Sequence, residues 1–439
     1  MQHARAPALQ YPGYRTNQFD ADFLDRVIVV TGVLSTVTAL LLSVAILLIG
    51  HGLQTTVVPL YADSLGWSRE VIGYIGSAYF AGFVVGCLTI PRLVSRVGHI
   101  RVFGVLASTA TAALLAVGTW NVVAVWIIAR FVTGWCFAGL YMVIESWLNE
   151  RTGAEQRGGV LSVYTIITLL AMCVGQSFIG FELDNSRLVM LGAILISLGT
   201  IPVGLTRSAA PAPIPAVNFR LKEVYRVSQV AVVGAFCGGF VTGGFWSLGP
   251  VVAKAQHLSS QQIGLFMAVT ILGGAIFQMP IGRLSDYADR RLVILGIALL
   301  GLGVCIAAPF ATALDPRLLF MLMFVFGGVS FPMYSLCLAH ANDNTQLPLM
   351  DIASVILLMN SVGSVFGPLV VSHLLAYTDF GLFIVAGVVL GALAAWTAWR
   401  VRLHSVARRF FTPFVSMPRT TPSVAEMLPE DDSESLSRP

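Results

Sequence analysis

The sequence predicts an all-α integral membrane protein in which twelve spanning helices form two related six-helix halves. Composition, the number of long apolar runs and an internal repeat predict this class. Of the 439 residues, 56% are hydrophobic and 11% are charged, and the mean hydropathy is +0.81. A soluble domain carries about 25% charged residues. The composition therefore excludes an ordinary soluble protein.

Twelve apolar runs are long enough to cross a bilayer, which takes about 20 residues of helix. They lie at 36–60, 71–93, 101–119, 122–147, 158–180, 187–205, 227–253, 261–281, 292–312, 316–339, 349–376 and 380–402. The first run is ambiguous, because apolar residues extend from Val27 to Tyr61. The seventh run begins near Val227, and the repeat offset then puts the first span's start near Ser35 or Thr36. We therefore expect an interfacial or extra-membrane turn at 27–34.

The internal repeat is clearest in the fourth and tenth runs. The segment FVTGWCFAGLYMVIESWLNERT begins at Phe131, and FVFGGVSFPMYSLCLAHANDNT begins at Phe324, 193 residues later. Phe, Val, Gly, Tyr, Asn and Thr recur at six matching positions. A duplicated bundle of membrane helices is typical of secondary transporters.

The repeat and the changes in composition divide the chain into five parts. We expect a cytoplasmic tail and interfacial segment at 1–35, helix bundles at 36–205 and 227–402, a cytoplasmic linker at 206–226 and a disordered cytoplasmic tail at 403–439. The linker starts rich in Pro and Ala, which disfavours a span, and the last residues, PEDDSESLSRP, have a disordered composition.

The basic residues predict the orientation. With both termini in the cytoplasm, 21 of the 26 Lys and Arg residues lie on the cytoplasmic side, four lie outside and one lies within a span. This bias follows the positive-inside rule. Because these charges are spread over many loops, the sequence predicts no nucleic-acid partner. We expect a monomer in a lipid bilayer with a small-molecule substrate.

Several chemistries are not supported by the sequence. The six cysteines all fall in predicted spans without the spacing of a metal site or disulfide framework. There is no GxxxxGK[ST] phosphate loop, and the chain has only two lysines. We therefore expect no cofactor, no metal and no enzymatic activity, and any uphill transport needs an ion gradient or a partner.

The fourth run carries two charged residues, Arg130 and Glu145. At 100° per residue they share one helix face with Gly134 and Tyr141, and about 22 Å of helix separates them. A buried Arg is costly unless it is paired or hydrated. Arg130 either recognises an anionic group or tunes a proton-binding carboxylate, or it bonds backbone carbonyls of neighbouring helices. Glu145 is either a proton site or an interfacial acid.

Two loop segments resemble a known family. The segment PRLVSRVGHIR (91–101) follows the second run, and GRLSDYADRR (282–291) follows the eighth. The latter resembles the G-x-L-x-D-R-x-G-R-R loop of the major facilitator superfamily, and RFVTG from Arg130 resembles its R-x-x-x-G element. ESWLNER (145–151), GSAYFAG (76–82) and QMPIGRLSD (278–286) look like its bacterial YcaD-like branch. The resemblance covers about 36–402.

This resemblance implies the major facilitator fold, a multi-pass protein of the bacterial inner membrane, and transport by alternating access. It also implies a conformational latch in the two loops, comprising Arg92, Arg96, Gly282, Arg283, Asp286, Arg290 and Arg291. The first copy departs from the signature, with Pro91 in the glycine place and Ser95 in the aspartate place. Asp286 is therefore the better latch candidate.

The resemblance further implies a central cavity lined by the first, fourth, seventh and tenth helices. The candidate substrate or proton-coupling residues are then Arg130, Glu145, His51, Gln54, Tyr141, Trp246 and Tyr334. Each polar residue taken alone also fits a packing role. At the matching tenth-run positions Arg130 becomes Met323 and Glu145 becomes Leu338. Any role in substrate binding or proton coupling that needs a charged side chain is therefore expected in the N-terminal half.

These observations predict a secondary active transporter of a small organic solute, with protons as the candidate coupling ion. The solute is expected to be sugar-like, amphipathic or weakly anionic. A broad-specificity drug or metabolite exporter and a non-transporting membrane sensor are the alternatives. The fifth run lacks the Gly-Pro element of many drug–proton antiporters of the superfamily, and the chain has no large sensory domain.

Overall fold

A computed structural model describes residues 17–152, 157–181, 183–205, 220–345, 347–403 and Phe414, with side chains from Thr38 onward except next to the gaps and at 312–314 and 316. This part of the chain contains helices and no strands. The helices are α1 (Asn17–Ser64), α2 (Arg69–Val97), α3 (His99–Thr119), α4 (Val123–Arg151), α5 (Arg157–Ser177), the 3-10 helix η2 (Phe178–Gly180), α6 (Asn185–Leu198), α7 (Ile201–Gly204), α8 (Leu221–Val227), α9 (Gln229–Ala255), α10 (Ser260–Tyr287), α11 (Arg290–Leu314), α12 (Pro316–Ser330), α13 (Met333–Asn342), α14 (Leu349–Leu375) and α15 (Gly381–Leu403).

Twelve helical segments of the described chain are long and apolar enough to cross a membrane. They match the twelve predicted runs to within a few residues, so the predicted fold class is confirmed. Three of the segments combine two helices, namely α5 with η2, α6 with α7, and α12 with α13. The last pair meets at Phe331 and Pro332, where α12 ends and a proline precedes the first turn of α13.

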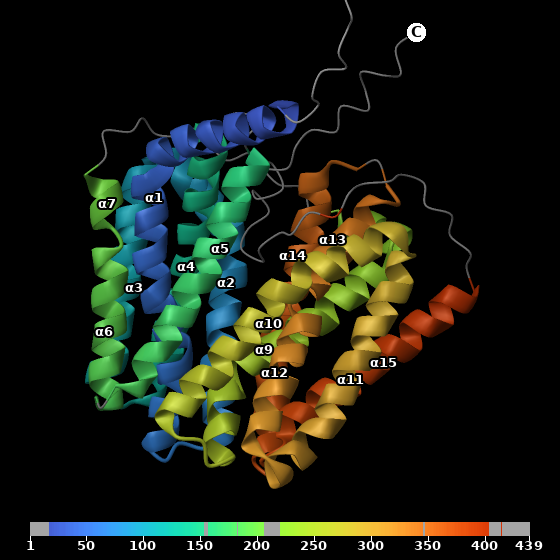
Figure 1. The fold of residues 1–439 in the computed structure, drawn as a ribbon. Coiled ribbons are helices and arrows are strands. Elements are labelled where there is room, and N and C mark those ends of the chain that lie inside the picture. The colour runs from blue at the N-terminus through green and yellow to red at the C-terminus, as the bar shows by residue number, and fades with distance from the viewer. Residues whose placement is uncertain are drawn as a thin grey trace, which may run out of the picture.

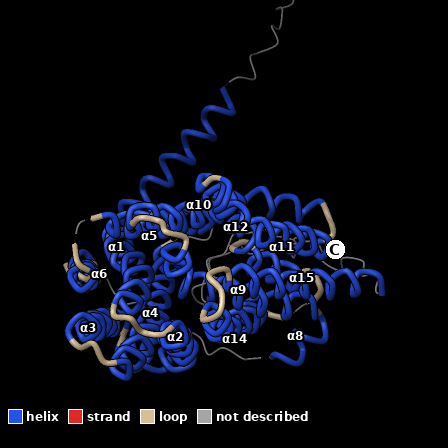
Figure 2. The backbone as a smooth tube through the Cα atoms, turned by 90° about the horizontal axis from the view of Figure 1, so that it is seen from below, coloured by secondary structure: helices blue, strands red, loops and turns tan. Residues whose placement is uncertain are grey.

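The predicted turn at 27–34 is wrong. Residues 17–64 form one continuous helix, of which only Thr38–Ser64 is a candidate span. The stretch 27–34 has one glycine and no proline, so little in its sequence interrupts the backbone hydrogen bonds of a helix. The first part of α1, dark blue in Figure 1, runs sideways from the start of the span, and Figure 2 shows that it projects outward from the bundle.

The spans form two bundles that correspond to the two halves of the sequence, α1–α7 and α9–α15 (Figures 1 and 2). Matching glycines build matching contacts in both. Gly82 of α2 lies against the carbonyl of Phe131 in α4, and Gly273 of α10 lies against the carbonyl of Phe324 in α12. No Cβ fits at either position. The repeat offset of 191 to 193 residues therefore relates tertiary contacts as well as sequence.

The two halves meet at the end of the molecule that carries the α1–α2 and α9–α10 connections, which we call the closed end. There Gly73 of α2 lies against Ser372 of α14, and the Ser77 hydroxyl donates to the carbonyl oxygen of Val365 at 2.8 Å. Gly264 of α10 lies against a carbonyl of α5. The helices of the two halves diverge toward the other end, which we call the opposite end (Figure 1).

The outer surface of the bundle carries large apolar side chains. Ile128 of α4, Phe310 of α11 and Val388 of α15 expose 64%, 67% and 67% of their surface. On a protein in water such side chains would cost free energy, whereas lipid solvates them. This surface agrees with the membrane location that the composition predicts.

Candidate functional site: a cavity between the two halves

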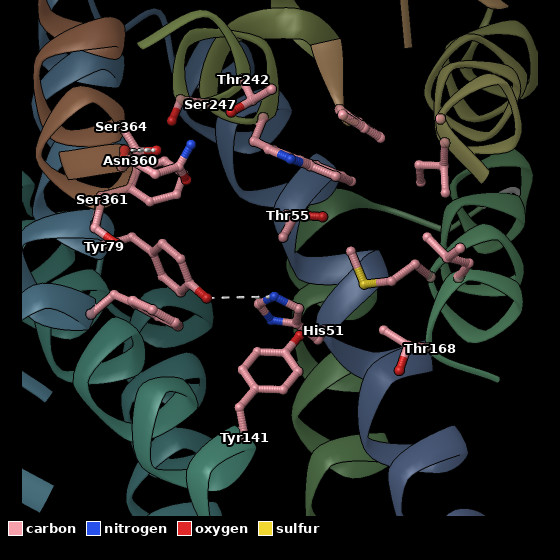
Figure 3. Close-up of a pocket in the computed structure, with 18 of the residues that line it drawn as sticks. His51, Thr55, Tyr79, Tyr141, Thr168, Thr242, Ser247, Asn360, Ser361 and Ser364 are labelled. Atoms are coloured by element: carbon pink, nitrogen blue, oxygen red, sulfur yellow. Dashed lines mark hydrogen bonds between the residues drawn. The ribbon is translucent and has the colours of Figure 1, made fainter. Parts of the chain in front are cut away.

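A cavity of about 230 Å³ lies between the halves at mid-depth, and residues of both halves line it (Figure 3). Helices α1, α2, α4 and α5 supply one wall, and α9, α10, α14 and the α12–α13 junction supply the other. Among the lining residues are the predicted candidates His51, Tyr141 and Trp246. Of the remaining candidates, Gln54 and Arg130 are buried beside the N-terminal wall.

The two walls are built from equivalent positions of the duplication. Equivalent residues are 191 positions apart in α1 and α9 and in α2 and α10. In α5 and α14 they are 192 positions apart, because Gly175 packs on the carbonyl of Ile49 in α1 as Gly367 packs on the carbonyl of Phe240 in α9. The lining pairs are His51 and Thr242, Thr55 and Trp246, Phe80 and Ile271, Phe83 and Gly274, Thr168 and Asn360, Leu169 and Ser361, and Met172 and Ser364. The backbone scaffold is thus shared, and the side chains have diverged.

His51 belongs to a ring of four interacting side chains. Gln54 Nε2 donates to His51 Nδ1 at 2.9 Å, and Arg130 Nη1 donates to Gln54 Oε1 at 3.2 Å. The His51 Nε2 atom lies 3.5 Å from the Tyr79 hydroxyl, and the Arg130 guanidinium lies 4.6 Å from the centre of the Tyr79 ring. In Figure 3, the dashed line between Tyr79 and His51 marks this contact.

The ring fixes the protonation state of His51. An arginine side chain only donates hydrogen bonds, so the carboxamide oxygen of Gln54 must face Arg130 and its NH₂ group must face His51. The Nδ1 atom of His51 is then an acceptor, and the neutral imidazole carries its proton on Nε2. The arrangement therefore holds a neutral histidine on the cavity wall.

Arg130 supplies a charge behind the wall rather than in it. Its side chain is 6% exposed and does not line the cavity. No ion pair is formed by Arg130 with any residue the structure describes. Its polar contacts are the amide oxygen of Gln54 and the ring face of Tyr79. A cation–π contact and a charge-assisted hydrogen bond offset part of the desolvation of the guanidinium.

Glu145 lies apart from Arg130, as helix geometry predicts. It is fully buried between α4 and α5, and the Tyr164 hydroxyl donates to its Oε1 at 3.1 Å. Glu145 does not line the cavity, whereas Tyr141, one turn earlier on α4, does. The proton-site interpretation of Glu145 stays a prediction.

The remaining two candidates differ in their positions. Trp246 of α9 lines the cavity and stacks on Phe331, with ring centroids 5.8 Å apart and an interplanar angle of 12°. Tyr334 of α13 is 1% exposed and lies outside the wall. Tyr141 and Tyr334 are equivalent in sequence, yet only Tyr141 borders the cavity.

Sequence reasoning missed most of the hydroxyl groups on the wall. Thr55 and Thr168 donate to carbonyl oxygens of their own helices at 2.7 and 2.8 Å, and so do Thr242 and Ser364 at 2.8 and 3.0 Å. Asn360 Nδ2 donates to the carbonyl of Ala235 at 3.1 Å. These hydroxyl groups donate their protons to backbone carbonyl oxygens, as is usual for helical Ser and Thr. These groups therefore offer lone pairs to the cavity. The spacing of Ser361 and Ser364, three residues apart on one helix face, is the signal that points to them.

The second loop segment forms a compact charged cluster at the opposite end. Arg290 is 1% exposed, and its Nε donates to Asp343 Oδ2 at 2.6 Å while its Nη2 donates to Asp286 Oδ1 at 3.3 Å. Arg291 pairs with Asp289 at 2.6 Å. Burial raises the pKa of Asp289, but the hydrogen bonds and charge of Arg291 together hold that pKa below its usual value.

The other latch candidates are less embedded. Arg92, Arg96 and Arg283 are exposed. Ser95, in the aspartate place of the first copy, donates to the carbonyl of Arg92 at 2.9 Å. The charged cluster is thus confined to the C-terminal half within the described chain. Its partner Asp343 was not among the predicted residues. The latch role stays a prediction.

A family model decides the classification. The model described as "Major Facilitator Superfamily" matches residues 40–251 and 231–422, one match for each half. The chain belongs to the major facilitator superfamily. Among curated relatives, the "Uncharacterized MFS-type transporter YcaD" of Escherichia fergusonii is 30% identical over 363 residues, covering 79% of this chain and 91% of that protein. The YcaD protein of Salmonella typhimurium is 28% identical over 362 residues with the same coverage. The resemblance to the YcaD-like branch is confirmed.

Solved structures agree on the fold. A bacterial homologue of the human lysosomal transporter Spinster, in an inward-facing and occupied conformation, superposes with a TM-score of 0.69 at 16% identity, covering 84% of this chain and 97% of that one. The nucleoside transporter NupG superposes with a TM-score of 0.68 at 14% identity, covering 83% and 98%. These structures share the two-bundle architecture with this chain. The family match in both halves makes the chain a membrane transporter.

Proposed function

We propose that this protein is a secondary active transporter that moves a small organic solute across the bacterial inner membrane by alternating access, coupled to protons. The observation that carries the proposal is the cavity, lined by equivalent positions of two halves that pack together at one end. With both termini in the cytoplasm, as the distribution of basic residues favours, the closed end faces outward and the structure is inward-facing.

The wall chemistry favours a neutral solute that carries hydrogen-bond donors and an apolar face. Thr55, Thr168 and Thr242 present acceptor lone pairs, because their protons are used within their own helices. Trp246 and Phe331 add an aromatic surface. No Lys or Arg lines the cavity in the described chain, which disfavours an anion. NupG is a nucleoside transporter by name, and nucleosides belong to this class of compound.

His51 is the site at which we propose that proton uptake is coupled to the solute. Protonation at Nδ1 turns that atom into a donor, so the Gln54 carboxamide must turn its oxygen toward His51 and release Arg130. The titratable groups that face His51 are Tyr79 on α2 and Tyr141 on α4, with the Arg130 charge beyond Gln54. One proton therefore changes contacts on α1, α2 and α4 together.

Glu145 is the second candidate for coupling, as the sequence predicts. It sits one turn beyond Tyr141 on α4, and its partner Tyr164 lies one turn before Thr168 on the same wall of α5. A change in the charge of Glu145 would therefore act on two wall helices. Full gradient-driven transport by Glu145→Gln and Arg130→Ala variants would exclude both residues from coupling.

The decisive experiment combines a ligand screen with reconstituted transport. Purified protein is first screened by thermal shift against neutral polyols and nucleosides, carboxylates and amines, and the stabilising compound is then followed in proteoliposomes with and without a pH gradient. We expect the gradient to drive transport by the wild type and by the surface variant His257→Gln, and not by His51→Gln. Equal gradient-driven transport by both variants would refute the role of His51, and no solute movement with any stabilising compound would refute the transporter.

A broad-specificity exporter is the second candidate, and the aromatic wall favours it. Phe80, Phe83 and Trp246 line the cavity together with Phe331, so unrelated apolar compounds could pack there. The same screen separates the two functions. A single chemical class of stabilising ligand supports a specific carrier, whereas several unrelated apolar classes support the exporter.

A further inference from the structure

The tail that follows α15 touches the second loop segment at one described residue, Phe414. Its backbone N–H donates to Asp286 Oδ1 at 2.9 Å, across 128 residues of sequence. Its ring fills the space beside Gly282, so that a Cβ at Gly282 would collide with the ring. Gly282 is buried, and Asp286 is partly buried. Phe414 is thus held against α10 by two interactions, a hydrogen bond to Asp286 and the packing of its ring on the backbone of Gly282.

The face of α10 that Phe414 covers is the face on which the two halves meet. Gly282 lies 18 residues after Gly264, which is five helical turns and about 27 Å along the same face. At the closed end, Gly264 packs against the carbonyl of Gln176 in α5. Between the two glycines, Ile271 and Gln278 line the cavity. One face of α10 therefore runs from the inter-half contact, past the cavity, to Phe414.

Alternating access, on which this inference rests, requires the two halves to come together at the opposite end when the closed end opens. Gly282 lies on the same side of α10 as Gly264, and this side faces the N-terminal half. The Phe414 ring and its backbone N–H, seated at Gly282 and Asp286, occupy space that this approach needs. The equivalent place in the first half is Pro91 of α2, which is 191 residues earlier and partly exposed.

We propose that Phe414 is an intramolecular brake, which docks on the Gly282 face of α10 and favours the conformation that is open at the opposite end. Phe414 must leave this face before the halves close there. The occupant is the chain's own Phe414, and its chemistry is an aromatic ring with a backbone N–H beside a carboxylate. The contact acts on conformation and requires no particular solute.

The test measures the distance between the halves at the opposite end in full-length protein. Spin labels are placed at Val97 of α2 and Leu292 of α11, which are both exposed, after the native cysteines have been replaced by alanine. Double electron–electron resonance in lipid nanodiscs then gives the distance distribution. We expect Phe414→Ala to raise the ratio of short to long distances about threefold, the equivalent of a lost contact of modest strength. Phe310→Ala, which removes an exposed ring on α11, is the matched control and leaves the ratio unchanged.

A second measurement tests the contact in the otherwise unaltered chain. A photo-crosslinking benzoylphenylalanine at position 414 is irradiated in membranes, and the captured peptide is identified by mass spectrometry. Capture of the segment 278–287 supports the docking, and capture only elsewhere overturns it. An unchanged distance ratio in Phe414→Ala overturns the brake even if docking occurs. Both readouts are independent of transport, so a failure of the proposed carrier activity would show in the proteoliposomes instead.

Discussion

Asp63 and Lys254 occupy the same position in the two copies of the duplication, 191 residues apart, and they form an ion pair with each other. Lys254 Nζ lies 2.7 Å from Asp63 Oδ2 and joins α9 to α1 at the closed end. In a two-fold interface, a residue near the axis meets its own counterpart. Identical charges would repel there, so opposite charges at the two equivalent positions allow this contact to hold the halves together. Arg69, in the same half as Asp63, pairs with it as well.

Removing the charge of Lys254 should loosen the closed end. Lys254→Gln deletes the inter-half pair and leaves the pair of Asp63 with Arg69 intact. Partly exposed pairs contribute about 0.2–1 kcal/mol, so the population open at this end should rise by up to about fivefold. The rate at which a membrane-impermeant thiol reagent modifies a cysteine at Thr242, in a chain without native cysteines, measures this population.

The matched control for that prediction is Arg187→Gln. Arg187 pairs with Asp184 within the N-terminal half near the same end, and both side chains are largely exposed. Its loss should leave the labelling rate of the cavity cysteine unchanged. Equal labelling rates for Lys254→Gln and the wild type would show that the inter-half pair does not bias the conformation.

Gln54 should be essential to the stability of the N-terminal half because it is the hydrogen-bond acceptor for Arg130. In Gln54→Leu the guanidinium loses its acceptor at a buried position. An unsatisfied buried donor costs about 1–3 kcal/mol, and more when it is charged. We expect a lower midpoint of thermal unfolding in detergent. Gln261→Leu, at an exposed position near the start of α10, is the control and should unfold like the wild type.

The spans were predictable from sequence, because twelve apolar runs of spanning length carry a strong and redundant signal. The wall was predictable only in part. His51 and Trp246 stand out by residue type, whereas Thr168 looks like any helical threonine until the helix is oriented against its neighbours. The pair of Asp63 and Lys254 was not predicted, because charges at helix ends look like ordinary loop charges and their partners depend on how the two halves dock.

The buried ion pair of Arg290 and Asp343 should stabilise the opposite end of the C-terminal half. Both side chains are 1% exposed, and removing Asp343 takes from the buried guanidinium its nearer carboxylate, which lies at 2.6 Å against 3.3 Å for Asp286. We expect Asp343→Asn to cost about 3–5 kcal/mol, less whatever Asp286 recovers through its own contact with Arg290. Asp289→Asn is the comparison, because its pair with Arg291 is partly exposed and should matter less. Unfolding of the two variants by denaturant, followed by tryptophan fluorescence, ranks them, and equal losses would contradict the assignment.

Gly264 and Gly296 offer a paired test of how the halves meet. A Cβ at Gly264 meets the carbonyl oxygen of Gln176 across the interface, whereas a Cβ at Gly296 of α11 meets nothing within 4 Å. Alanine favours a helix by about 0.5–1 kcal/mol over glycine, so Gly296→Ala should be neutral or stabilising. Gly264→Ala gains the same helix propensity, yet it must push α10 away from α5 at the closed end. Labelling of the cavity cysteine at Thr242 should therefore accelerate in Gly264→Ala alone. The same rate in both variants would mean that the interface yields to a methyl group, and the close approach of the two backbones would then not be what keeps this end shut.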